Sequence, residues 1–370
     1  MRKDIKNIKV IKVFDLKEIN TNDDYKFLYK SLINIKKDFD INEKIVFIHD
    51  EIEFYHRGSD VGFRIYNLFC LLNKIDISLS AICVITTNNN LEKSIASFIT
   101  HENDKPLIIP VIVSEMTYNN LCKFKHIIPH NKDLEFKALC MMGTPRTHRI
   151  LLRQFFQYAD LLNEIEISFN DKNNLMLSPD SNIEIINDKT LSELGLVFST
   201  TPNLNENWCI FPKFQNIKNI ASTKLKTLEN SKHIEPNDGE FYNQFAIDIV
   251  TETAFDYPHA FISEKTLRPL YLQKPFITVG PPKFLEYLHS CGFETFSDFW
   301  SEDYDNIEDP QERFISCTQT INYVLSLPLN QIKSMVDDMQ PRLEKNRQIL
   351  INYIENTYKP LYNMIYYFQN

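Results

Sequence analysis

Short apolar runs alternate with helical patterns along most of this chain, and that alternation constrains the fold more than any other feature. In the first third, apolar runs at 44–50, 81–86 and 107–113 read as strands, and residues 63–74 and 91–98 follow a helical pattern. Strands joined by helices pair in parallel, because a crossover helix returns the chain to the end of the sheet where the previous strand began. We therefore predict a parallel, doubly wound α/β sheet here, with an edge or a bend where a proline interrupts the third strand.

The same alternation starts again near residue 135. Predicted elements follow in this order: strand 136–142, helix 146–163, strand 165–169, strand 245–250, a helix and a strand within 261–282, and helices at 283–290 and 310–326. The polar segments 170–192 and 213–240 read as surface loops or insertions. A chain of 370 residues is long enough for two domains. The prediction is an α/β protein with two Rossmann-like domains that face a central cleft, residues 1–134 and 135–340. A helical C-terminal tail, residues 341–370, is predicted to pack across them.

Composition excludes several classes of protein. The formal net charge is −9, with 40 basic and 49 acidic residues, which argues against nucleic acid as the main partner. The start of the chain lacks an apolar signal core, and no stretch approaches the ~20 apolar residues of a membrane span. Seven scattered cysteines show no spacing typical of a zinc site. We expect a cytoplasmic protein with reduced thiols, no membrane span and no bound metal.

Glycine is scarce, at 7 of 370 residues, and no glycine-rich phosphate loop occurs. Any phosphate must therefore be held by side chains and helix ends. The segment 261–282 offers such a place, because Glu264 and Lys265 lie in the first turn of a predicted helix that Ser263 precedes. The N-terminus of a helix attracts phosphate, and a lysine adds a full charge. The alternative interpretation is that Ser263 only caps the helix and that its two neighbours are surface charges.

A second group of basic residues follows strand 136–142, where Arg146, His148 and Arg149 open the next predicted helix. Basic residues in a first turn oppose the helix dipole, which favours an anion site over a solvated turn, although the solvated turn stays the alternative. If strands 136–142 and 245–250 are both central, the two helix starts meet at one edge of the sheet. Arg149 would then face Lys265 across a diphosphate.

The segment from Val250 to Pro282 resembles the donor-binding segment of the α-1,3-fucosyltransferase family. The family pattern is a strand ending in Glu-Asn, then Tyr-x-Thr-Glu-Lys, a helix and Pro-x-x-x-Gly; this chain has Glu252-Thr253, then Phe261 in place of the tyrosine, then Glu264-Lys265. The likeness covers about residues 136–300 and includes the helix that begins near Arg146.

The resemblance implies a glycosyltransferase of the GT-B class, inverting and independent of metal, that binds its donor in the C-terminal domain. It assigns the donor ribose to Glu264 and the diphosphate to Lys265 and Arg149, and Arg146, Glu252, Thr253 and Phe261 fall in the same donor region. The expected reaction moves a sugar from a nucleotide-diphosphate donor to a hydroxyl group of a glycan or glycolipid. The nucleotide-sugar is a co-substrate, and no cofactor is expected.

The catalytic base should come from the first domain, at the carboxyl end of a strand. Glu115 directly follows strand 107–113, and Asp50 and Glu51 follow strand 44–49. A carboxylate in such a position is more often a solvated loop residue than a base, and that alternative stays open for each of the three.

Two further patterns have simpler interpretations. The Asp-x-Asp pairs, Asp38 with Asp40 and Asp303 with Asp305, match the metal motif of the other glycosyltransferase fold, but we interpret them as surface carboxylates. The aromatic loop 292–300 could stack on a sugar or base, or it could be buried packing. Two other functions stay open: a transferase that acts on modified DNA bases, and a non-catalytic nucleotide- or sugar-binding relative.

Overall fold

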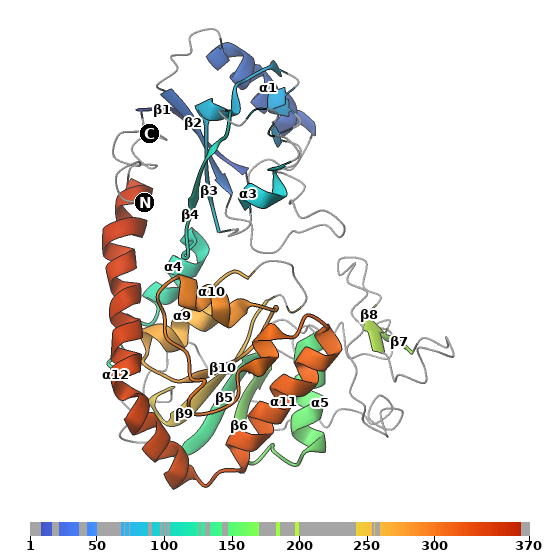
Figure 1. The fold of residues 1–370 in the computed structure, drawn as a ribbon, viewed down its shortest axis with the longest axis vertical. Coiled ribbons are helices and arrows are strands. Elements are labelled where there is room, and N and C mark those ends of the chain that lie inside the picture. The colour runs from blue at the N-terminus through green and yellow to red at the C-terminus, as the bar shows by residue number, and fades with distance from the viewer. Residues whose placement is uncertain are drawn as a thin grey trace. The chain divides into compact units, whose positions relative to one another are not determined.

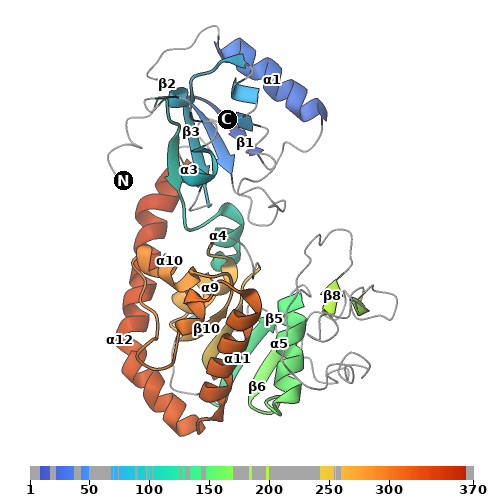
Figure 2. The ribbon, with the colours of Figure 1, turned by 45° about the vertical axis from the view of Figure 1, so that its right-hand side comes forward.

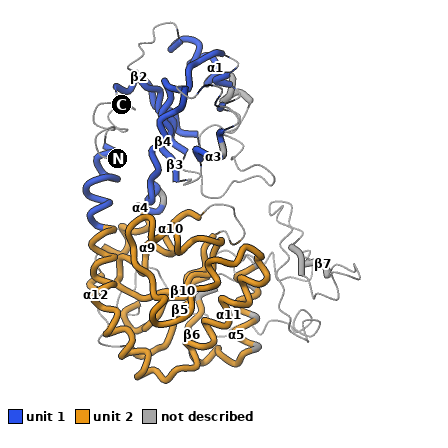
Figure 3. The backbone as a smooth tube through the Cα atoms, in the orientation of Figure 1, with its two compact units in different colours: residues 1–118, 351–370 blue, residues 119–350 orange. Residues whose placement is uncertain are grey.

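The structure is a computed structural model that describes residues 9–16, 22–36, 43–49, 68–69, 71–73, 75–87, 91–96, 99, 101, 104–125, 127–129, 134–142, 147–169, 183–185, 197–199, 242–253, 255 and 260–363. The chain divides into two units: unit 1 is residues 1–118 with 351–370, and unit 2 is residues 119–350 (Figure 3). Residues 119–134, assigned to the first domain on sequence, belong to unit 2 in this division.

Unit 1 contains a parallel sheet of four strands in the order β1-β2-β3-β4. The strands are β1 (Lys9–Asp15), β2 (Glu43–His49), β3 (Ile82–Thr86) and β4 (Leu107–Pro110). The prediction of a parallel sheet is confirmed, and β1 was not predicted. The prediction of a doubly wound sheet is wrong for these four strands, because each new strand is added on the same side of the last.

Right-handed crossovers that all move in one direction place their helices on one face of a sheet. In unit 1 that face packs against α1 (Asn22–Lys36), helical residues around Leu68–Leu72 and α3 (Leu91–Ser94). The other face is covered from the far end of the chain. There, Leu361 packs against Val46, Ile85 and other apolar residues of the strands.

Aromatic contacts hold this C-terminal segment within unit 1. The ring of Tyr358, in the π-helical turn Ile354–Tyr358, lies 4.6 Å from that of Tyr118 and 4.3 Å from that of Tyr362. The main-chain N–H of Ile112 donates to the Tyr353 hydroxyl at 3.0 Å. Tyr358 and Tyr362 of the C-terminal tail are therefore packing residues, and the aromatic residues at 366–368 lie outside the described residues.

Unit 2 contains a second parallel sheet, in the order β10-β9-β5-β6 (Figure 1). Its strands are β5 (Phe136–Met142), β6 (Ile165–Phe169), β9 (Phe245–Thr251) and β10 (Phe276–Val279). From β5 the chain first adds β6 on one side and then returns to add β9 and β10 on the other. The winding direction therefore reverses between β5 and β9. A separate antiparallel pair is formed by β7 (Ile183–Ile185) and β8 (Val197–Ser199).

Helices cover both faces of the unit 2 sheet, as a reversal of winding requires. Figures 1 and 2 show α5 (Thr147–Tyr158) beside α11 (Pro310–Ser326) on one face, and α9 (Glu264–Tyr271) with α12 (Leu329–Tyr353) on the other. Asp309 caps α11 by accepting the N–H of Glu312 at 2.9 Å, which explains why this helix begins at the predicted residue. None of the helices in the described part of the chain is long and apolar enough to cross a membrane.

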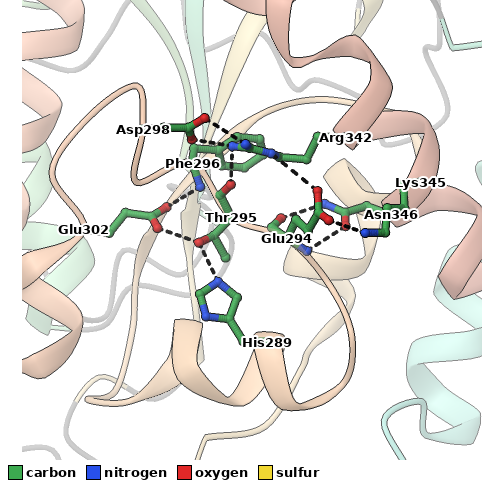
Figure 4. A network of polar contacts seen from close by, with 9 residues as sticks. All are labelled: His289, Glu294, Thr295, Phe296, Asp298, Glu302, Arg342, Lys345 and Asn346. Carbon is green, nitrogen blue, oxygen red and sulfur yellow. Dashed lines mark hydrogen bonds and ion pairs between the residues drawn. The ribbon is translucent and has the colours of Figure 1, made fainter.

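The aromatic loop after α10 (Phe284–Ser290) is tied to α12 by the polar network of Figure 4. Arg342 donates to the Asp298 carboxylate at 2.6 and 2.8 Å and to the Thr295 carbonyl at 2.6 Å. Asn346 donates to the Glu294 carbonyl and accepts its N–H, both at 2.8 Å. Of the loop's four large aromatic side chains, Phe293, Phe296 and Trp300 are buried and Phe299 is half-buried. The interpretation of this loop as packing is thus confirmed for the three buried rings.

Candidate functional site

The reversal between β5 and β9 opens the carboxyl edge of the unit 2 sheet. Pairing between the two strands runs from Phe136↔Phe245 to Leu139↔Asp248 and ends three residues before the last residue of either strand. Ligands of open α/β sheets bind where neighbouring strands part in this way. The candidate site lies at this point.

Two buried basic residues of α5 reach across this opening to the end of β9. Arg149 donates through Nη2 to the carbonyls of Thr251 at 3.0 Å and Glu252 at 3.1 Å. Nε2 of His148 lies 2.9 Å from the same Glu252 carbonyl, so this nitrogen carries a proton. These contacts satisfy carbonyls beyond the last β5–β9 pair, and they keep a guanidinium that is 2% exposed at the strand end.

Glu252, the first residue after β9, places a buried carboxylate beside them. It is 1% exposed, accepts the hydroxyl of Thr266 at 2.5 Å and lies 3.3 Å from the N–H of Thr253. Its backbone continues the sheet, because its N–H donates to the Val279 carbonyl at 3.0 Å. Gly280 lies beside Glu252: a Cβ there would make an ordinary contact with Glu252 Cβ at 3.5 Å and a tight one with Thr278 Cγ2 at 3.1 Å.

The start of α9 completes the site. Ser263 is extended (φ −89°, ψ 175°) and accepts the N–H of Lys265 at 3.2 Å, so the predicted cap is confirmed. The Lys265 ammonium donates to Glu264 Oε1 at 2.6 Å and to Thr253 Oγ1 at 3.0 Å. The side chains of Glu264 and Lys265 are 28% and 15% exposed, so this pair is the part of the site nearest to solvent.

The two carboxylates respond differently to this environment. Burial raises the pKa of Glu252, and the Lys265 ammonium and hydrogen bonds from Ser263 and Thr266 oppose the rise. Burial also acts to raise the pKa of Glu264, but Lys265, hydrogen bonding and Arg149 outweigh it, and the pKa lies below its usual value. The site therefore contains two cations and two carboxylates, and the environments of the carboxylates shift their pKa values in opposite directions.

A buried arginine that supports the site was not predicted from the sequence. Arg313, in the first turns of α11, donates to the Phe255 carbonyl at 2.7 Å and to the Gly280 carbonyl at 3.3 Å, and its guanidinium lies 4.7 Å from the Phe255 ring centre. That ring stacks on His148 with centroids 5.5 Å apart. One buried arginine thus joins the loops after β9 and β10, but its position in a polar first turn gave no local signal.

The structure brings together Arg149, Glu252, Thr253, Glu264 and Lys265, the central members of the predicted donor site. Phe261, which precedes α9, is buried. Arg146 lies outside the described residues, so it cannot be placed. Among the described residues, the buried hydroxyl of Thr251, at the end of β9, has no hydrogen-bond partner.

The predicted catalytic carboxylates follow strands of unit 1. Glu115 is the first residue of α4 (Glu115–Cys122), after β4 and directly after Ser114, and its side chain is not described. Asp50 and Glu51, beyond β2, lie outside the described residues. Nearby, Nδ1 of His49 lies 2.9 Å from Thr86 Oγ1 at the ends of β2 and β3, with both side chains buried. This buried pair was not predicted, and its burial fits a structural role.

One Asp-x-Asp interpretation needs correction. Asp303 is exposed as predicted, but Asp305 is buried and caps α10, because its carboxylate accepts the N–H of Leu285 at 2.9 Å and of Glu286 at 3.1 Å. The free N–H groups at a helix start draw in a carboxylate that a sequence pattern alone places at the surface. Asp38 and Asp40 lie outside the described residues. Within the described ranges, no group of three or more His, Cys, Asp and Glu side chains is arranged to hold a metal ion.

No protein-family model matches the sequence, and no curated protein matches it.

Proposed function

We propose that this protein is a glycosyltransferase that takes a sugar from a nucleotide-diphosphate donor and transfers it to a hydroxyl group of a glycan or glycolipid. One observation carries the proposal. Two cations from different helix starts, Arg149 and Lys265, lie with Glu252 and Glu264 where the winding of the unit 2 sheet reverses. Phosphates bind at helix starts beside strand ends of this kind.

The proposed roles follow from the chemistry of each group. Lys265, partly exposed in the first turn of α9, contributes a mobile charge for the diphosphate. Arg149 is fixed by main-chain carbonyls and contributes a buried positive field. Glu264, an acceptor-only group when ionised, suits the hydroxyls of the donor ribose. These are the roles that the resemblance to α-1,3-fucosyltransferases assigns, and we extend them to this chain without naming the sugar.

The proposed reaction is a direct displacement at the anomeric carbon. A carboxylate of unit 1, Glu115 or Asp50, takes the proton of the acceptor hydroxyl while the bond to the diphosphate breaks. The cations of unit 2 stabilise the charge that develops on the leaving diphosphate. Binding and metal-independent transfer are the two parts of the proposal that an experiment can separate.

A thermal-shift screen of the full chain against UDP, GDP, CMP and dTDP, each with and without EDTA, tests the first part. At least one nucleoside diphosphate should raise the melting temperature, and EDTA should not abolish the effect. Lys265→Met should weaken that ligand about 10- to 100-fold, the effect of losing a charge-assisted hydrogen bond. Lys333→Met, which removes a lysine from α12, is the matched control and should bind as the wild type does.

Each contrary result has a defined meaning. Failure of every nucleotide to stabilise the protein would overturn the donor site, and equal binding by Lys265→Met would overturn the role of that lysine. Stabilisation that requires a divalent metal would contradict the metal-independent mechanism. Nucleotide binding without donor hydrolysis or transfer would identify a non-catalytic relative.

A further inference from the structure

Lys265, which we propose binds the diphosphate, is already paired with Glu264, its neighbour in the chain. Lys265 Nζ lies 2.6 Å from Glu264 Oε1 and 3.0 Å from Thr253 Oγ1. An ammonium group has three donors, and the protein occupies two of them. A phosphate that accepts the third donor would lie beside the Glu264 carboxylate, so the two anions would compete for one cation.

The surrounding charges make that competition matter. Among the described members of the site, two carboxylates, Glu252 and Glu264, accompany two cations, Arg149 and Lys265, so the formal charges of these four groups balance. Glu252 is 1% exposed and cannot turn to solvent without rearrangement. A phosphate that entered beside an unmoved Glu264 would bring excess negative charge into a partly buried region, where solvent screens it weakly.

Glu264 is the carboxylate that can move. Its side chain is 28% exposed, and its ion-pair partner is the Lys265 ammonium, with a backbone N–H as a further hydrogen-bond donor. Glu252 is instead buried and accepts the buried hydroxyl of Thr266. A carboxylate released from an ammonium needs new hydrogen-bond donors, because leaving a partly buried charge unmatched is costly. Pyrophosphate brings no diol to supply them, but the two adjacent hydroxyls of a ribose do.

We propose that Glu264 is a specificity-determining residue: its ion pair with Lys265 excludes phosphates that lack a neighbouring diol and yields to a nucleoside diphosphate, whose ribose hydroxyls replace the lysine as its partner. This inference rests on the proposed function, because it takes a nucleoside diphosphate as the ligand. The exchange keeps both charged groups hydrogen-bonded: a phosphate oxygen accepts from Lys265, and Glu264 accepts from the diol. Selectivity then depends on one exchange of partners rather than on the shape of a pocket.

Calorimetric titration of the full chain with pyrophosphate, UDP, GDP and the 2′,3′-dideoxy forms of both nucleotides tests the inference. The Glu264→Gln variant should bind pyrophosphate about tenfold more tightly and the best nucleoside diphosphate about tenfold more weakly, so the ratio of the two dissociation constants changes about 100-fold. The wild type should bind the dideoxy nucleotide about tenfold more weakly than its parent, and Glu264→Gln should erase that difference. Glu312→Gln removes an exposed carboxylate from the first turn of α11 and should change neither ratio.

The outcomes separate the inference from the function on which it rests. Nucleotide binding by the wild type, with an unchanged pyrophosphate-to-nucleotide ratio in Glu264→Gln, would overturn the inference and leave the proposed function standing. Absence of nucleotide binding by the wild type would overturn both, even if pyrophosphate bound. The dideoxy comparison uses the wild type alone, so equal binding of parent and dideoxy nucleotide overturns the inference even if the variant fails to fold.

Discussion

The two sheets are both parallel and both four-stranded, yet they differ at their carboxyl edges. In unit 1 the pairing of β2 with β3 continues to the last residue of each strand, His49↔Thr86. In unit 2 the pairing of β5 with β9 ends three residues early, and side chains of α5 occupy the opening. The difference follows from winding, because only the unit 2 sheet reverses direction between central strands. Two sheets of one class can therefore differ in whether their edge offers a place for a ligand.

The interiors of the sheets differ in a second respect. Residues 45–48 of β2 and 82–85 of β3 are all apolar. The central strand β9 instead carries Asp248, which is 1% exposed and accepts three hydrogen bonds of 2.8–3.0 Å from Arg268 and one of 2.5 Å from the Tyr242 hydroxyl. A central strand of unit 2 thus contains a buried ion pair, whereas residues 45–48 and 82–85 of unit 1 pack through apolar contacts.

Breaking that ion pair should produce the largest effect. Asp248→Asn leaves the Arg268 guanidinium buried without its charge partner, which we expect to cost about 3–5 kcal/mol of the free energy of unfolding. Trp300 is buried in unit 2, so the change in its fluorescence during urea unfolding follows this unit. Hydrogen exchange of the β2 and β3 amides should stay unchanged.

A double variant provides the control for this prediction. Replacing both partners, Asp248→Leu with Arg268→Met, should cost much less than the single change, because no charge is then left buried. Equal losses in the single and double variants would mean that packing, not charge, is what Asp248 contributes.

The pH dependence of stability should also differ between the units, because of Lys274. This lysine is 2% exposed and donates to the Asn243 carbonyl at 3.1 Å, and burial lowers its pKa from 10.5 to about 7, against the opposing effect of Asp248. Between these values the folded protein holds a neutral lysine while the unfolded chain binds a proton. Unfolding takes up that proton, so the contribution of Lys274 to stability rises with pH, by about 1 kcal/mol per pH unit.

Urea unfolding at several pH values from neutral to mildly alkaline tests this sign. Lys274→Met should be more stable than the wild type near neutral pH, and the gap should close as the pH rises, because other titrating groups cancel in the difference. Lys333→Met, on α12, should give a curve parallel to that of the wild type. A parallel curve for Lys274→Met as well would contradict the lowered pKa.

Much of the strand and helix order could be predicted from the sequence. Strand 136–142 and helix 310–326 match β5 and α11 residue for residue, because apolar runs and a capped, proline-led start are local signals. The first strand, Lys9–Asp15, was missed because charged residues interrupt it and its pairing with β2 depends on a distant segment. The winding direction of a sheet likewise depends on how the crossover helices pack. The residue pattern of a single strand or helix does not specify it.

In the candidate site, too, some features could be predicted from local sequence and others depend on tertiary packing. Convergence of Arg149, Glu264 and Lys265 could be predicted because neighbouring parallel strands end at one edge. Their actual partners could not: Arg149 donates to strand-end carbonyls, and Lys265 pairs with Glu264. Such choices depend on which acceptors tertiary packing leaves open, and the buried Asp305 was misplaced for the same reason.

The smallest predicted effects compare one helix cap from each unit. Ser114 Oγ accepts the Thr117 N–H at 3.0 Å, and Ser263 Oγ accepts the Lys265 N–H at 3.2 Å. Alanine at either position should cost about 1 kcal/mol of stability, measured by hydrogen exchange in the helix that each serine caps. Only Ser263→Ala should also weaken nucleotide binding, by a few fold, because Ser263 hydrogen-bonds the buried Glu252 carboxylate as well. If both variants bound nucleotide equally well, the Ser263 cap would matter no more for binding than the Ser114 cap. That result would contradict a nucleotide site at the start of α9.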